Sequence, residues 1–126
     1  MAGISCVLYN IGGECRKRQG GLFAMAHVYV AVAIERGDKA IKTCDCAAIN
    51  ELYEYVPDMF DYVDEESLER YEVKTIKAQQ EILSKVYGYF SKYGDFNTDL
   101  SNESINDGLL CGLNDDDFIY IVDCHE

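Results

Sequence analysis

An apolar stretch near the start of the chain places the strongest constraint on the fold. Residues 23–34 are almost wholly apolar and rich in Val, Ile, Ala and Tyr, a composition that favours β-structure. Apolar side chains occupy both parities of this run, which predicts a strand covered on both faces. A turn containing Gly37 and a second short run, residues 40–43, follow it. This order predicts a β-hairpin over residues 22–46, with the rest of the chain packed around it.

Three further segments show strand patterns. Residues 3–11 form a short apolar run that ends at two glycines, and residues 117–124 form another close to the end of the chain. Both predict strands. Residues 70–77 alternate between charged and β-branched or aromatic side chains, which favours a half-exposed strand. A backward extension of the next helix is the alternative for that segment.

Helical periodicity appears in the middle of the chain. Apolar residues spaced by three and four predict a helix over residues 47–56, continued to residue 66 as a kinked helix or a second short one because Pro57 interrupts it. Residues 78–93 predict a second long helix, and a short one is expected from Ser101. The chain therefore predicts an α+β fold, with a mainly antiparallel sheet built on a long central hairpin and two or three helices packed on it.

Length and composition predict one intracellular domain. The 126 residues suit a single globular domain spanning 1–126. The chain does not start with a basic segment followed by an apolar one, so we expect no signal peptide. No apolar run reaches the roughly 18 residues of a membrane span. The six cysteines are then expected as free thiols in a reducing compartment, and we expect a cytoplasmic protein.

The charge distribution carries the main functional information. The net charge is −12, and it is unevenly spread: residues 1–42 hold six Lys/Arg and three Asp/Glu, whereas residues 43–126 hold five and twenty. A field of this sign repels nucleic acids and anionic membranes and attracts basic surfaces. We therefore expect no direct contact with nucleic acid or membrane. The oligomeric state is left open.

A series of carboxylates defines the expected partner-binding surface. On a continuous helix, spacings of three and four residues place one carboxylate per turn on a common face. A triplet of aspartates before the last strand adds a second acidic block. The expected partner-binding residues are Glu51, Glu54, Asp58, Asp61, Asp64, Glu65, Glu69, Asp115, Asp116 and Asp117. A solvated face with no partner is the alternative interpretation.

Such a surface imitates the phosphate rows of a nucleic acid. The expected function is therefore that of a small binding or inhibitor protein, whose partner is a basic protein such as a nuclease or another nucleic-acid-binding protein. An inhibitor of the anti-CRISPR type, encoded by a phage against a defence enzyme, and an immunity protein for a nuclease toxin both fit this description. The residues do not distinguish between them.

An enzyme is the alternative from another class. Cys46 is expected at the start of a helix, where the dipole lowers the pKa of a thiol, and His27 lies on the central strand. The pair would form the dyad of a cysteine-dependent hydrolase. A core position for His27 is the competing interpretation, and we expect no enzymatic activity.

Metal-binding patterns are present only in imperfect form. Cys44 and Cys46 with Cys124 and His125 offer four zinc ligands, but their spacing is tighter than structural zinc sites use. Residues 95–106 place oxygen-bearing side chains at alternate positions, as in a calcium loop, but lack its central glycine and final glutamate. We therefore expect no metal and no cofactor.

Overall fold

The computed structural model describes residues 27–126, so the strand expected over residues 3–11 lies outside the described part. The protein is an α+β fold with a five-stranded mixed sheet and a few short helices. Its elements are β1 (His27–Ile34), α1 (Ile41–Tyr53), β2 (Tyr62–Glu72), α2 (Val73–Ala78), the 3₁₀ helix η2 (Gln80–Lys85), β3 (Val86–Phe90), β4 (Phe96–Asn97), α3 (Asn102–Ser104), the π-helical turn η3 (Ile105–Leu109) and β5 (Phe118–His125).

The strand order of the sheet is β2-β5-β1-β3-β4. The pair β1–β3 is parallel, and the other three neighbouring pairs are antiparallel. β5 and β1 lie side by side over their whole length, with His27 opposite His125 and Ile34 opposite Phe118. β2 forms one edge of the sheet and carries five acidic residues, Asp64, Glu65, Glu66, Glu69 and Glu72.

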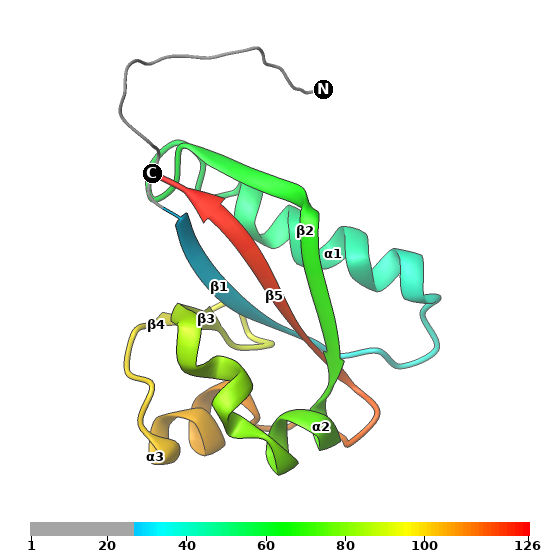
Figure 1. Cartoon of the computed structure of the whole chain (residues 1–126). Coiled ribbons are helices and arrows are strands. Elements are labelled where there is room, and N and C mark those ends of the chain that lie inside the picture. Colours follow the sequence, from blue (N-terminus) through cyan, green and yellow to red (C-terminus); the bar gives the residue numbers. More distant parts are fainter. Residues whose placement is uncertain (1–26) are drawn as a thin grey trace.

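Helices cover both faces of the sheet (Figure 1). α1 packs on one face, and α2, η2 and η3 pack on the other, so two separate hydrophobic clusters form. β1 contributes to both, because Val30 and Val32 point into the cluster under α1 whereas Ala31 and Ala33 point into the other. This alternation confirms the prediction of a strand covered on both faces.

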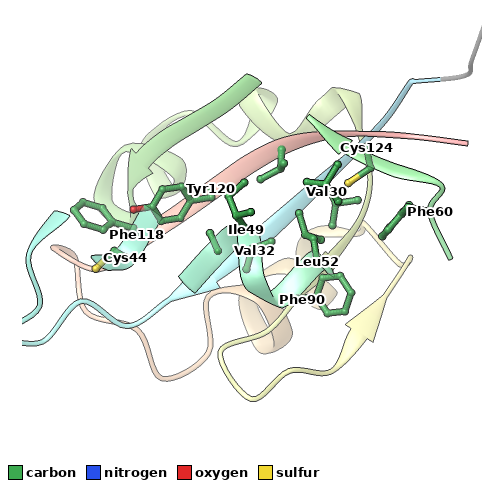
Figure 2. Close-up of a cluster of buried hydrophobic side chains, with 13 residues drawn as sticks. Val30, Val32, Cys44, Ile49, Leu52, Phe60, Phe90, Phe118, Tyr120 and Cys124 are labelled. Carbon is green, nitrogen blue, oxygen red and sulfur yellow. The ribbon is translucent and has the colours of Figure 1, made fainter. Parts of the chain in front are cut away.

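The first cluster is drawn in Figure 2, where α1 supplies Ile49 and Leu52 and the sheet supplies the residues beneath them. A polar network also holds α1 in place. Asp45 accepts a hydrogen bond from the hydroxyl of Tyr120 at 2.6 Å and lies 3.1 Å from Arg70 Nη1. α1 is thereby tied to both β5 and β2.

The predicted hairpin over residues 22–46 is wrong in its second half. The turn after β1, closed by a hydrogen bond from Lys39 N to Arg36 O and with Gly37 at φ 55°, leads into α1 rather than a second strand. α1 begins at Ile41, six residues before the predicted helix. Cys44 and Ala48, four residues apart on its buried face, show that the helical spacing starts earlier than we inferred.

The helix predicted past Pro57 is absent from the structure. α1 ends at Tyr53, a turn with a cis peptide bond before Pro57 follows, and β2 begins at Tyr62. The strand predicted over residues 70–77 is correct only to Glu72, where β2 ends and α2 begins. Both the strand interpretation and its helical alternative therefore describe part of this segment.

The helix predicted over residues 78–93 is also wrong. Its first part is η2, and its second part is strand β3. In β3, Tyr89 packs into one hydrophobic cluster and Phe90 into the other, so the segment supplies both faces of the sheet. The last strand and the short helix after Ser101 are confirmed as β5 and α3. None of the helices within residues 27–126 has the length and apolar character needed to cross a membrane.

Candidate functional site

The expected row of carboxylates is distributed over three elements rather than one helix. Glu51 lies in the last turn of α1, Glu54 follows its end, Asp58 and Asp61 lie in the turn before β2, and Asp64 lies in β2. The predicted row required a continuous helix, but α1 ends at Tyr53, so the later carboxylates do not share a helical face. We refer to residues 51–66 as the acidic segment, which contains seven carboxylates and no Lys or Arg.

Local contacts hold the two ends of the acidic segment together. The hydroxyl of Tyr53, the last residue of α1, donates a hydrogen bond to Glu65 of β2. Asp64 accepts hydrogen bonds from Ser67 Oγ at 2.8 Å and from the backbone N–H of Glu66 at 3.0 Å. The second group of contacts lies in a bulge of β2, where pairing with β5 shifts between Asp64 and Glu69.

The carboxylates of the acidic segment have no cationic partner within the described residues. The ion pairs that Lys and Arg form in residues 27–126 involve other acids, those of Glu35, Asp45, Glu69, Glu72 and Asp115. Five of the seven carboxylate residues in the segment are exposed, and Glu51 and Asp64 are half-buried. Their charge is therefore directed mainly to solvent.

Glu51 shows the electrostatic strain of this arrangement. Burial, followed by repulsion from Glu54, raises the pKa of Glu51 above its usual value. α1 carries no basic residue in its last turn, so these two acids lie at the negative end of the helix dipole without compensation. A cation brought by another molecule would relieve this repulsion.

Three of the four remaining predicted partner-binding residues, Glu69, Asp115 and Asp117, are engaged in other contacts. Glu69 pairs with Lys85 at 3.0 Å, and the hydrogen bond from Lys85 lowers the pKa of Glu69. Asp115 pairs with Lys77 at 3.0 Å. Asp117 is buried, whereas Asp116 is exposed and has no ion pair within residues 27–126. The structure does not unite this block with the acidic segment through any described contact.

A second polar cluster, which sequence analysis missed, lies where β1 begins and β5 ends. His27 Nδ1 lies 2.9 and 3.1 Å from the two carboxylate oxygens of Asp123, and His125 Nε2 lies 3.5 Å from Asp123 Oδ2. One ligand atom from each of the three residues falls within 4.8 Å of the others. We call these residues the His–Asp–His cluster.

Burial makes the His–Asp–His cluster unusual. The side chain of Asp123 is 7% exposed and that of His125 is 14% exposed. Within the described residues, His125 Nε2 is buried and has no hydrogen-bond partner. Burial lowers the pKa of His125, which favours the neutral imidazole. The alternation of Asp123 and His125 in a strand is the sequence signal that points to this shared face.

The proposed Cys46–His27 dyad is not assembled. Cys46 lies in the second turn of α1, not at its first residue, and α1 packs on the face of the sheet that carries Val30 and Cys124. His27 contacts Asp123 on the opposite face, because neighbouring residues of a strand point to opposite sides. Cys46 therefore does not lie at the start of the helix, and His27 lies on the other face of the sheet.

The four-ligand zinc set is likewise dispersed. Figure 2 places Cys44 and Cys124 at opposite ends of the first hydrophobic cluster. The suggested calcium loop is explained by local hydrogen bonds: Asn97 Oδ1 accepts from the N–H of Asp99, and Asp99 Oδ1 accepts from the N–H of Ser101. These are the turns that Asn and Asp form in loops without an ion.

Thiol labelling gives a direct check of this arrangement. Cys46 and Cys111 are exposed, whereas Cys44 and Cys124 are buried, and burial raises the pKa of Cys124 to about 12. At pH 8 we expect iodoacetamide to modify the two exposed cysteines and to spare the two buried ones until the protein is unfolded, because the thiolate is the reactive form. Peptide mass spectrometry measures each site. Rapid modification of Cys124 in the folded protein would contradict the placement of β5.

Comparison with known proteins gives no family for this chain. No protein-family model, no curated protein and no solved structure matches it significantly.

Proposed function

We propose that this protein binds a basic partner protein through the acidic segment. The observation that carries the proposal is the set of seven carboxylates in residues 51–66, which form no ion pair with any Lys or Arg of residues 27–126. They come from the end of α1, the following turn and the first part of β2, and Tyr53 links the first of these elements to the last.

Electrostatics supports this interpretation over a merely solvated face. Like charges near one another oppose folding, and acids at the end of a helix oppose its dipole. Burial is the main cause of the raised pKa of Glu51, and repulsion from Glu54 adds to it. Lys and Arg side chains from a partner would remove the repulsion and gain charge-assisted hydrogen bonds. A negative surface of this kind also accelerates encounter with a basic partner.

The partner we infer is a protein that itself binds nucleic acid. Such proteins gather Lys and Arg to neutralise phosphates, and the same side chains suit an exposed cluster of carboxylates. Tyr53 and Tyr62, exposed by 41% and 45%, add the aromatic character common in protein interfaces. This binding mode would serve two kinds of protein: an inhibitor of a nucleic-acid-dependent defence enzyme, and an immunity protein for a nuclease toxin.

Charge reversal tests the proposal. The variant Glu54→Lys, Asp58→Lys, Asp61→Lys changes three exposed residues and should weaken binding of a purified partner at least about 100-fold. The reason is that each desolvated interfacial charge pair contributes about 1.5 kcal/mol or more, and about 1.4 kcal/mol corresponds to tenfold in affinity. Partners are first captured with the wild-type protein at low salt, identified, purified and then titrated by calorimetry.

A matched control separates location from net charge. The variant Glu81→Lys, Glu103→Lys, Asp107→Lys alters three exposed acids on η2, α3 and η3 and changes the net charge by the same amount. This control variant should bind the partner as tightly as the wild-type protein does. In a separate test, added duplex DNA should displace the wild-type protein from its partner, because both would bind the same basic surface. Equal binding by both triple variants would show that the acidic segment is not the interface.

A further inference from the structure

We propose that the His–Asp–His cluster binds one divalent first-row transition metal ion, with His27 Nδ1, one carboxylate oxygen of Asp123 and His125 Nε2 as ligands. None of the three ligands belongs to the acidic segment, although that segment borders the site: Asp61 donates its backbone N–H to His125 O, and Asp64 lies opposite Asp123. The proposal does not depend on the proposed function.

The register of β1 and β5 brings the three ligands together. His27 lies directly opposite His125 in the antiparallel pair, and Asp123 lies two residues before His125 on the same face. Both strands are central in the sheet, since β5 lies between β2 and β1, and β1 lies between β5 and β3. In Figure 1 the start of β1 and the end of β5 lie together at the corner away from α2 and α3. Ligands on two paired strands are held more rigidly than ligands on loops.

The distances already approach those of a coordinated ion. Two ligands about 2.0 Å from a tetrahedral metal lie about 3.3 Å apart. The separations from Asp123 oxygen to His27 Nδ1 and His125 Nε2 are 2.9 Å and 3.5 Å. The two histidine nitrogens lie within 4.8 Å of each other, so the imidazoles have to rotate for all three atoms to surround one centre.

The chemistry of the cluster also calls for a cation. Asp123 is buried, and no Lys or Arg of residues 27–126 pairs with it. Buried carboxylates are normally paired or bound to a metal. His125 Nε2 is buried without a hydrogen-bond partner in the same part of the chain. A metal ion would coordinate the carboxylate of Asp123 and Nε2 of His125 at once.

The surroundings define the kind of ion. Two imidazoles and a carboxylate suit Zn²⁺, Co²⁺, Ni²⁺ or Fe²⁺ rather than Ca²⁺ or Mg²⁺, which prefer oxygen ligands. Asp64 lies opposite Asp123 in β2 and adds negative potential beside the cluster. The side chain of His27 is 55% exposed, so the remaining coordination position is open to water or to a side chain of another molecule.

Metal titration of the full-length reduced protein tests the site. Equilibrium dialysis should give one Zn²⁺ per chain, and Co²⁺ should produce visible absorption bands without thiolate charge-transfer absorption. His27→Ala and His125→Ala should each weaken Zn²⁺ binding more than about 100-fold, since even the loss of an outer-shell partner costs about 10–100-fold. Zn²⁺ should also raise the melting temperature of the wild-type protein but not that of His27→Ala.

Two control variants separate this site from other metal-binding groups. Cys46→Ser, Cys111→Ser removes the exposed thiols of the described region, and Glu54→Lys, Asp58→Lys, Asp61→Lys removes exposed carboxylates; both should bind Zn²⁺ as wild type does. If His125→Ala fails to fold, protection of both histidines from diethyl pyrocarbonate by Zn²⁺ replaces it as the readout. Absence of stoichiometric Zn²⁺ binding, undiminished binding by His27→Ala, or thiolate absorption with Co²⁺ would each overturn the proposal.

Discussion

Replacing Phe90 by alanine should lower the free energy of unfolding by about 3–5 kcal/mol, the usual cost of truncating a fully buried phenylalanine. Phe90 is 0% exposed and lies at the end of β3, where it packs under α1. The centroids of the Tyr55 and Phe96 rings both lie 4.8 Å from its own. The substitution would therefore leave a cavity between β3, the turn that carries Tyr55 and the strand that carries Phe96. Movement of one of these segments by itself would not fill that cavity. Urea unfolding followed by circular dichroism measures the change.

Tyr87→Ala is the matched control for Phe90→Ala. Tyr87 lies on the same strand but is 55% exposed, so its loss should cost about 1 kcal/mol or less. A helix over residues 78–93 would bury Tyr87 and Phe90 on one face. Similar large losses at both positions would therefore favour the helix and contradict β3.

Replacing Asp117 by alanine should lower the free energy of unfolding by about 2–4 kcal/mol. The carboxylate of Asp117 accepts the backbone N–H of Arg36 at 2.9 Å and that of Asn114 at 2.7 Å. Hydrogen bonds to a charged group contribute about 1.5–3 kcal/mol each, and partial access of water to the two donors reduces the sum. Asp117 thus joins the loop after β1 to the loop before β5.

The neighbouring Asp116→Ala variant serves as the control for Asp117→Ala. Asp116 is exposed, so its replacement should change stability by about 0.5 kcal/mol or less. Thermal unfolding of the two variants beside wild type measures both effects. If Asp117→Ala were as stable as Asp116→Ala, the carboxylate of Asp117 would have to be solvated rather than buried.

The proposed binding surface and the proposed metal site meet at the start of β2 and in the turn before it, where Asp61 donates its backbone N–H to His125 O at 2.9 Å. Asp64 belongs to the acidic segment and lies opposite Asp123 of the His–Asp–His cluster. Their failures remain distinguishable, because the triple variant at Glu54, Asp58 and Asp61 leaves the cluster intact and His27→Ala leaves the acidic segment intact. Loss of partner binding in both would indicate a shared interface.

Sequence patterns located two central elements correctly. The apolar run before Ile34 indicated a strand with two covered faces, and residues 117–124 indicated the last strand. Both segments carry apolar side chains on both parities, and burial on two faces requires that pattern wherever the neighbours come from. The helix after the first turn was also predicted, although it begins earlier, at Ile41.

The carboxylate row failed for a reason that spacing does not reveal. Glu51 and Asp64 are separated by a turn that ends the helix and leads into β2. A spacing of three or four residues therefore does not place them on a common face. The histidine cluster was missed for the complementary reason. His27 and Asp123 are 96 residues apart, and only strand pairing makes them neighbours.

By itself the sequence determined which segments are buried on two sides and how strongly the second part of the chain is charged, because both properties depend on composition and local alternation. The tertiary structure alone decided which acids face solvent and which side chains meet across strands. Residues 86–90 illustrate the difference. Their aromatic side chains are compatible with a helix or a strand, and they form a strand because they pair with β1. Contacts between distant segments outweigh local preference, since burial of Tyr89 and Phe90 on opposite faces gains more free energy than helix propensity supplies.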